Sequence, residues 1–244
     1  MSRLLFSIRY DGGNYHGWQV QSNGVTVQQT VQDALQSVLG TRVNVTGCSR
    51  TDAGVHANMF CFHSDINSEI PIERFPSALN ANLPDDISVL SCSHVSDDFH
   101  ARYSCTGKNY IYKIYDSSIR NPFMRNYMLY HKGKLDAELM NNAARHFIGT
   151  HNFIGFCSSG SSVSDTVRTV NECRVMRDGD VINVSVSANG FLYNMVRIIV
   201  GTLIEVSEGK IDVENIPKII SSCDRSKAGR TVPAHGLFLN EVYY

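Results

Sequence analysis

An arginine and an aspartate stand two residues apart, as Arg50 and Asp52, in the glycine-flanked segment 47–57, which reads GCSRTDAGVHA. An ionised carboxylate held on such a turn can act as a covalent nucleophile. A neighbouring guanidinium favours the charged form of that carboxylate. An ordinary turn is the competing interpretation, because Asp and Gly favour turns. An exposed Arg–Asp pair would then contribute roughly 0–1 kcal/mol. The local sequence leaves both interpretations open.

Arg197 is the second candidate, because it interrupts the otherwise uncharged stretch 193–200 (YNMVRIIV). Glu205 lies two turns further along the same helix, beyond the i+4 spacing at which side chains meet. An arginine on an apolar helix either extends its charged end to water or pairs with a carboxylate from elsewhere. Burying it without a partner would cost several kcal/mol. Asp52 is a candidate partner, and a structural salt bridge is the alternative.

Aromatic and basic residues mix in the segment 102–113, where Tyr110 and Tyr112 share one face of an expected strand. Tyrosines beside cations suit base stacking and phosphate neutralisation. They could equally fill the face of a sheet. A glycine loop at 11–19 contains the chain's one tryptophan, Trp18, but lacks the G-x-G-x-x-G spacing of a dinucleotide site. A loop that closes over a polynucleotide is an interpretation of residues 11–19 that the sequence leaves equally open.

Composition excludes several classes of protein. The chain has 244 residues, 43% of them hydrophobic and 18% charged, as in a globular protein with a substantial core. No apolar run could span a bilayer, and we expect no signal peptide. Seven cysteines without a C-x-x-C pair favour reduced thiols in the cytoplasm, and the nine scattered histidines predict no metal site. The net charge of −1 leaves room for a local basic surface, and 15 arginines against 7 lysines suit phosphate contacts.

Hydrophobic periodicity marks the elements that must position these residues. Strands are expected at 4–10, 43–46, 55–63, 88–95, 99–115 with a bend at Gly107, 167–177, 181–188 and 237–243. Helices are expected from the Thr26 cap to Gly40, at 71–80, after Asp136, at 191–207 and after Asp212. Asp178 and Gly179 predict a hairpin turn, and 158–164 a loop.

This mixture of antiparallel strands and helices predicts an α+β fold. We expect two similar domains, at 1–105 and 106–244. Each would be an antiparallel or mixed β-sheet with helices packed on one face. The active-site cleft is expected between the two, because sites form preferentially at domain interfaces.

Several motifs together resemble the tRNA pseudouridine synthase A family over nearly the whole chain. They are Tyr10-Asp11-Gly12, Gly17-Trp18-Gln19, Arg50-Thr51-Asp52-Ala53-Gly54-Val55-His56-Ala57, Asn80-Ala81-Asn82-Leu83-Pro84, Asp98-Phe99-His100-Ala101-Arg102, Tyr110-Ile111-Tyr112 and Met195-Val196-Arg197 before Val200-Gly201. The Arg-Thr-Asp-x-Gly-Val-His segment is the most specific of them. Ser49 departs from the family, which usually has glycine before the arginine.

The resemblance implies an isomerase of tRNA processing that converts uridines of the anticodon stem-loop, at positions 38–40, to pseudouridine. It implies that Asp52 is the catalytic nucleophile and that Tyr110 lies against the target base. Arg50 would displace or hold the flipped nucleotide, and Arg197 would pair with Asp52. It further implies no cofactor and no metal, tRNA as the partner, no membrane, and a homodimer in the cytoplasm. An inactive RNA-binding module and a Mg²⁺-dependent hydrolase or phosphotransferase are the competing hypotheses.

Overall fold

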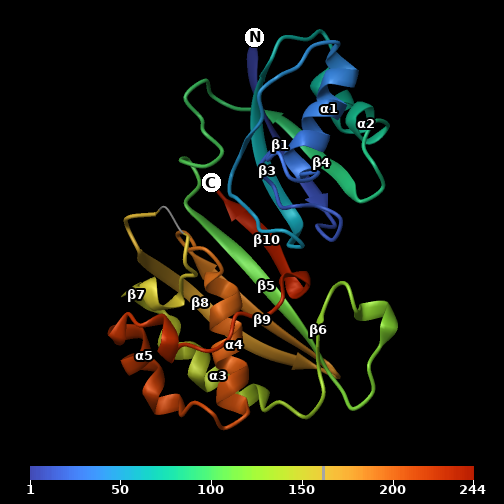
Figure 1. The fold of residues 1–244 in the computed structure, drawn as a ribbon. Coiled ribbons are helices and arrows are strands. Elements are labelled where there is room, and N and C mark those ends of the chain that lie inside the picture. Colours follow the sequence, from blue (N-terminus) through green and yellow to red (C-terminus); the bar gives the residue numbers. More distant parts are fainter. Residues whose placement is uncertain (161–162) are drawn as a thin grey trace. The chain divides into compact units, whose positions relative to one another are not determined.

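The computed structural model describes residues 1–160 and 163–244. Contacts within the chain divide it into two compact units (Figure 1). The first unit comprises Met1–Thr106 with Phe238–Tyr244, and the second comprises Gly107–Leu237. Each unit combines a β-sheet with helices, so the predicted α+β class is confirmed. Within the described residues, no helix is long and apolar enough to cross a membrane.

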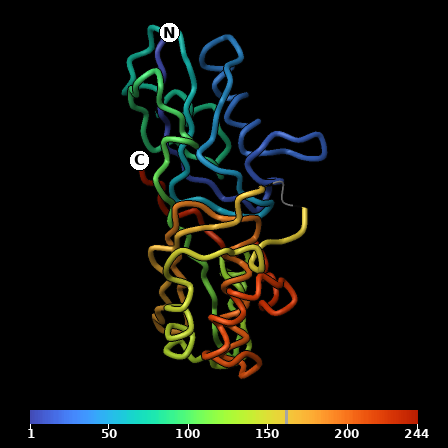
Figure 2. The backbone as a smooth tube through the Cα atoms, turned by 90° about the vertical axis from the view of Figure 1, so that its left-hand side faces the viewer, coloured from blue at the N-terminus to red at the C-terminus, as the bar shows by residue number. Residues whose placement is uncertain are grey.

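The sheet of the first unit has the strand order β4-β1-β3-β10, with the short β2 also paired to β3. Its strands are β1 (Ser2–Tyr10), β2 (Thr46–Gly47), β3 (His56–Ile66), β4 (Ile87–His94) and β10 (Leu237–Tyr243). β1 is antiparallel to both β3 and β4, whereas β10 is parallel to β3 and places Phe238 opposite His56. The C-terminus lies beside the green segment near Ala101, whose carbonyl accepts a 2.9 Å hydrogen bond from the Tyr244 hydroxyl (Figure 2).

Helices α1 (Val27–Leu39) and α2 (Phe75–Asn80) belong to the first unit, and a 3₁₀ turn at Ile72–Arg74 precedes α2. The Thr26 hydroxyl caps α1 by accepting a hydrogen bond from the Gln29 N–H, as predicted. Gly40 ends α1 in the left-handed conformation, at φ 72°. The buried face of α1 consists of Val27, Val31, Ala34 and Leu35. The core of the unit contains Phe6, which stacks on Phe62 with ring centroids 4.9 Å apart.

The sheet of the second unit has the order β5-β9-β8-β7, and β6 runs parallel to β5. Its strands are β5 (Gly107–Asp116), β6 (Leu129–His131), β7 (Gly149–Asn152), β8 (Val167–Asp178) and β9 (Val181–Ala188). β8 and β9 form the predicted hairpin, with Gly179 at φ 56° in its turn. The helices of this unit are α3 (Ala137–Ala144), α4 (Met195–Ser207) and α5 (Ile216–Ser222). Asp136 caps α3 through the Leu139 N–H, as expected.

Three elements differ from the sequence-based expectation. The strand expected at 43–46 is reduced to the two residues of β2. The strand expected at 99–115 begins only at Gly107, because the His100 imidazole accepts the backbone N–H groups of Arg102 and Tyr103 and holds a turn there. Helix α4 begins at Met195 rather than 191, because Asn194 takes a left-handed conformation. The loop expected at 158–164 lies partly outside the described residues.

Candidate active site

Asp52 begins a tight turn between β2 and β3. The Val55 N–H donates a 3.1 Å hydrogen bond to the Asp52 carbonyl, and Gly54 has φ 78° at the third position. A type II turn requires a positive φ at that position. The preceding Thr51 is buried, and its hydroxyl lies 2.9 Å from the Tyr10 hydroxyl on β1. Asp52 as a whole is partly exposed, so a partly accessible residue stands on a fixed backbone.

The glycine loop at 11–19 packs directly against this turn. The Trp18 N–H donates to the Thr51 carbonyl at 3.2 Å, and the Gly54 N–H donates to the Tyr15 carbonyl at 3.3 Å. Gly17 has φ 82°, and a Cβ added there would lie 2.3 Å from the Thr51 carbonyl oxygen. This loop therefore supports the backbone that carries Asp52.

Gly12 makes the closest approach of this loop to the turn. A Cβ added at Gly12 would lie only 1.9 Å from the Val55 carbonyl oxygen. The contact is with backbone, which cannot rotate away as a flexible side chain could. Gly12 thereby joins the end of β1 to the far side of the turn. The sequence marks Gly12 as part of the Tyr10-Asp11-Gly12 motif but does not predict this contact, because it joins residues more than forty positions apart.

His56 follows the turn and is buried, with 1% of its surface exposed. Its Nδ1 accepts a 3.0 Å hydrogen bond from the Gly12 N–H, and the Asp11 carboxylate lies 3.0 Å from the same nitrogen. The Phe238 ring of β10 stacks on the imidazole with ring centroids 4.7 Å apart. His56 thus supports the turn; the sequence marks it as part of the Arg-Thr-Asp-x-Gly-Val-His motif but assigns it no separate role.

Tyr15 and Asp86 hold the outer side of the glycine loop. The Tyr15 hydroxyl donates a 2.6 Å hydrogen bond to the Asp86 carboxylate, and the Asp11 N–H donates to the Asp86 carbonyl at 2.9 Å. Burial, reinforced by the hydrogen bond to Asp86, raises the pKa of Tyr15 well above its ordinary value. Tyr15 therefore stays protonated and keeps donating at neutral pH.

Two predicted residues lie in the second unit. Tyr110 is buried on β5, opposite Val186 of β9, and meets the Phe191 ring edge-on at a centroid distance of 5.0 Å. Arg197 lies in the first turn of α4 and is partly buried. Its Nε donates to the Val232 carbonyl at 2.7 Å. A second nitrogen of the guanidinium, Nη1, donates to the Asn194 side-chain oxygen at 2.6 Å.

The segment that carries Val232 is itself packed against α4. The Gly229 N–H donates to the Thr202 hydroxyl at 2.9 Å, and a Cβ added at Gly201 would lie 1.8 Å from the Arg230 carbonyl oxygen. Gly201 thus allows the segment to approach the helix backbone. These contacts, made one turn further along α4, position the Val232 carbonyl that accepts the hydrogen bond from Arg197.

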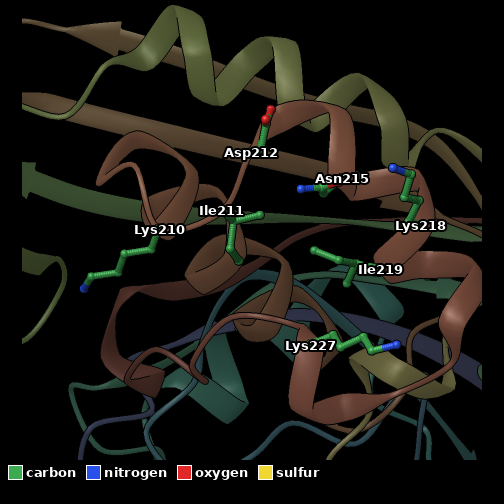
Figure 3. Close-up of a pocket in the computed structure, with 7 residues that line it drawn as sticks. All are labelled: Lys210, Ile211, Asp212, Asn215, Lys218, Ile219 and Lys227. Atoms are coloured by element: carbon green, nitrogen blue, oxygen red, sulfur yellow. The ribbon is translucent and has the colours of Figure 1, made fainter.

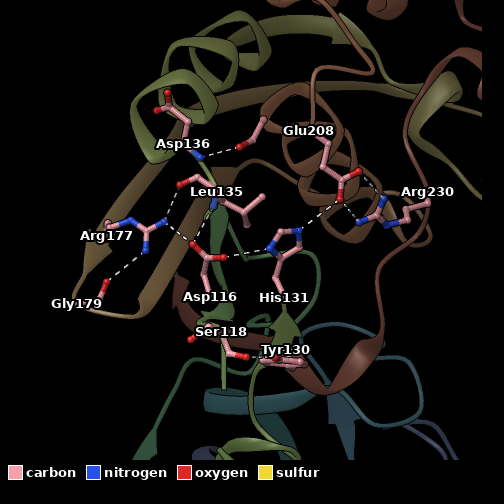
Figure 4. A network of polar contacts seen from close by, with 11 residues as sticks. Asp116, Ser118, Tyr130, His131, Leu135, Asp136, Arg177, Gly179, Glu208 and Arg230 are labelled. Atoms are coloured by element: carbon pink, nitrogen blue, oxygen red, sulfur yellow. Dashed lines mark hydrogen bonds and ion pairs between the residues drawn. The ribbon is translucent and has the colours of Figure 1, made fainter. Parts of the chain in front are cut away.

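A polar network in the second unit fixes the same segment from its outer side (Figure 4). The Arg230 guanidinium reaches both oxygens of Glu208 at 3.1 and 3.3 Å, and Glu208 also lies 3.4 Å from His131 Nε2. His131 Nδ1 lies 3.0 Å from the buried Asp116, which also accepts a 2.6 Å bond from Arg177. The hydrogen bond from Arg230, with further help from Lys210, lowers the pKa of Glu208 to about 2.

The predicted site residues fall on two units. Arg50, which is exposed, and Asp52 share the turn of the first unit, whereas Tyr110 and Arg197 belong to the second. The predicted pair of Asp52 with Arg197 therefore remains a prediction. Residues 1–160 and 163–244 contain no cluster of three or more His, Cys, Asp or Glu side chains that could hold a metal ion.

A surface pocket of about 370 Å³ lies in the second unit, beside α5 (Figure 3). Ile211 and Ile219 contribute its apolar lining, and Lys210, Lys218 and Lys227 line it as well. None of the residues predicted to do chemistry belongs to this pocket.

Comparison with known proteins decides the family. A family model described as tRNA pseudouridine synthase matches residues 7–104 and 143–244. The chain belongs to the tRNA pseudouridine synthase family. The resemblance drawn from the motifs is thereby confirmed, and with it the expectation of an enzyme of the isomerase class. The first of the two matched segments contains Arg50 and Asp52, and the second contains Arg197.

Curated relatives carry the name tRNA pseudouridine synthase A. Those of Acetivibrio thermocellus and Clostridium acetobutylicum are 48% and 46% identical over 244 residues, which is 100% of both chains in each comparison. The protein of Staphylococcus aureus is 43% identical over 99% of this chain and 91% of its own. Among solved structures, a Cbf5-Nop10-Gar1 complex aligns with 96% of this chain and 57% of that chain, at a TM-score of 0.40 and 10% identity. At that distance the alignment carries no information on function.

Proposed function

We propose that this pseudouridine synthase isomerises uridines at positions 38–40 in the anticodon stem-loop of tRNA, with Asp52 as the catalytic nucleophile. The proposal is supported chiefly by the Asp52 turn, which lies in a segment that the family model matches. The backbone on both sides of Asp52 is fixed, at Thr51 and Val55, while Asp52 itself is partly exposed. A carboxylate so placed can attack a nucleotide that enters from outside the protein.

The reaction breaks the bond between N1 of uracil and C1′ of ribose and forms a bond between C5 and C1′; C5 gives up its hydrogen as a proton, and N1 gains a proton. It moves no electrons to or from an external acceptor, so the residues of the chain can carry it without a cofactor. A uridine within a stem must leave the base stack before Asp52 can reach it, as in other base-modifying enzymes. In this proposal Arg50 holds the displaced nucleotide and Tyr110 lies against its base.

Arg197 is proposed as the cation beside Asp52. A cation close to the carboxylate would keep it ionised and therefore nucleophilic. Two of the guanidinium nitrogens donate to the Val232 carbonyl and to the Asn194 side-chain oxygen, and these contacts orient the Arg197 side chain. We further propose that the protein acts in the cytoplasm as a homodimer.

The test is to incubate the purified protein with unmodified tRNA and to map pseudouridine by carbodiimide-dependent stops of reverse transcription. The Asp52→Asn variant is expected to lose detectable product while it still binds tRNA. Asp33→Asn is the matched control, because Asp33 is an exposed acid of the same unit that pairs with Arg42. Product formation by Asp52→Asn at the rate of the unaltered protein would overturn the assignment of the nucleophile. Stops at other positions would overturn the assignment to 38–40.

A further inference from the structure

The segment that follows β5, includes β6 and ends at Leu135 carries basic side chains and no acidic ones. Residues 117–135 contain Arg120, Arg125, Lys132 and Lys134, and no Asp or Glu. All four cations are exposed. The whole chain, in contrast, has 22 basic and 23 acidic residues. This concentration of cations creates a local positive potential on a protein whose net charge is −1.

Large apolar side chains are exposed in the same segment. Phe123 is 83% exposed, Ile119 is 76% exposed and Tyr127 is 39% exposed. Single exposed apolar residues are normal on protein surfaces, but three within nine positions of one ordered segment are a concentration that indicates a binding partner. Arg120 also lies over the Tyr130 ring, 5.7 Å from its centroid. Aromatic rings and cations are therefore interleaved along the segment.

The segment has a defined backbone. The Asn121 side chain accepts the Phe123 N–H at 3.0 Å and caps a 3₁₀ turn at Pro122–Met124. The Met124 carbonyl then accepts the N–H groups of Tyr127 and Met128, both at 3.0 Å. β6 pairs with β5. The segment is visible as the yellow-green stretch beside β6 in Figure 1. The structure thus holds Phe123 outward on an ordered turn.

We infer that the segment 117–134, here called the β5–β6 loop, is an RNA-contact site at which Phe123 stacks on an unpaired base and the four cations bind phosphates. Single-stranded nucleic acid is bound by this combination of a positive surface with exposed aromatic rings. The inference rests on the proposed function, which makes tRNA the substrate.

The proposed RNA contact at the β5–β6 loop is separate from the contact with the reacting nucleotide. Tyr110 lies near the start of β5, and the loop leaves β5 after Asp116. Six residues of extended strand span about 20 Å. The loop leaves β5 at Asp116 and returns at Leu129, opposite Ile114, so its two ends lie roughly 13–20 Å along the strand from Tyr110.

A second copy of the chain is the other possible occupant. If the two-fold axis of a dimer passed through this loop, the patch would face its own copy. Four cations without a single acid would then oppose four more cations, and like charges placed together disfavour association. Charge complementarity therefore favours RNA over self-association at this loop.

The experiment measures tRNA binding by filter retention across a range of salt concentrations. One variant replaces Arg120, Arg125, Lys132 and Lys134 with glutamine. The control variant replaces four other exposed cations of the second unit with glutamine, namely Arg145, Arg174, Lys218 and Lys227. Both variants lose the same total charge. Thermal unfolding, recorded for each, verifies that the fold is kept.

The loop variant is expected to bind tRNA about 10-fold to 100-fold more weakly at low salt. Its plot of log affinity against log salt should flatten by about 3 units, since each phosphate contact contributes about 0.7–0.9. Phe123→Ala should weaken binding about fivefold or more, with little change in that slope. An equal loss in the control variant, or unchanged binding in both loop variants, would overturn the inference.

Sedimentation of the same variants distinguishes the alternative partner. Conversion of a dimer to a monomer in the loop variants, with tRNA affinity unchanged, would assign the loop to self-association and overturn the inference. Binding of tRNA by Asp52→Asn at the unaltered affinity shows that substrate recognition is intact. Failure of the unaltered protein to bind tRNA would instead overturn the proposed function, and this inference with it.

Discussion

The Asn194 side-chain oxygen accepts a hydrogen bond of 2.6 Å from Nη1 of Arg197. Asn194 adopts the left-handed conformation, at φ 61°, and its amide nitrogen donates to the Ser158 hydroxyl at 2.9 Å. A non-glycine residue in this conformation is uncommon, and such residues cluster at functional sites. Asn194 thus begins α4, fixes one side of the guanidinium and connects it to the segment at Ser158.

We predict that Asn194→Ala lowers kcat about 10-fold with a smaller effect on KM, because Arg197 loses one of the acceptors that orient it. Alanine in the left-handed region should also destabilise the fold by about 1 kcal/mol. Asn194→Gly separates the two effects, since glycine tolerates that conformation and still removes the acceptor. Full activity in Asn194→Gly would show that the backbone conformation, and not the hydrogen bond, is what matters.

Gly12→Ala should damage both stability and turnover. The added Cβ would meet the Val55 carbonyl oxygen at 1.9 Å, so the loop or the Asp52 turn must move. We expect a loss of about 2 kcal/mol or more in the free energy of unfolding. Gly13→Ala is the control, because its Cβ would meet only the Asp11 side chain, at 3.1 Å. Equal unfolding midpoints for the two variants would contradict this account of the loop.

The hydroxyls of Tyr10 and Thr51 should be coupled energetically. They lie 2.9 Å apart in the interior, and removing either one leaves the other without this partner. Tyr10→Phe and Thr51→Val are each expected to cost about 1–2 kcal/mol. The double variant should cost less than the sum of the two, by about 1 kcal/mol, in a double-mutant cycle followed by urea unfolding. Strict additivity would show that the pair does not hold the turn.

Glu208→Gln should reduce stability at neutral pH by about 1 kcal/mol, a value that allows for the solvent screening of a partly exposed ion pair. The pKa of Glu208 is about 2 in the fold and 4.5 in its absence. A depressed carboxylate pKa stabilises the fold fully above the unfolded value, and this stabilisation disappears as the pH falls from about 4.5 to 2. The difference between the two proteins should therefore shrink over that window when unfolding is measured at each pH. A difference in the free energy of unfolding that stays constant across this pH range would exclude the ionisation of Glu208 as its cause.

Local signals were enough to predict much of the fold. The alternation of β1, the Thr26 cap of α1 and the Asp178-Gly179 turn all involve residues within a few positions of each other. Each is determined by propensity and hydrogen bonding over a short stretch of chain. The site was harder to predict. Its supporting contacts, such as Gly12 with Val55, join distant residues and leave no periodic signature.

The start of α4 shows a different limit. The apolar stretch from Phe191 predicts a helix from there, but Asn194 turns the backbone left-handed and delays the helix to Met195. The same side chain then binds Arg197. Helical periodicity indicates which face of a helix is buried, but it does not reveal a single residue that leaves the helical conformation to hold a neighbour.

The parallel pairing of β10 with β3 has a consequence for how the protein is made. The first unit contains residues from both sides of Gly107–Leu237, so a ribosome must synthesise the entire second unit before the last strand of the first sheet exists. At 5–20 residues per second, the roughly 170 residues between β3 and β10 take about 10–30 s. During that interval the edge of β3 at His56 and Ala57 lacks its final neighbour. A nascent chain therefore passes through a stage in which an open strand edge is available to chaperones or to aggregation.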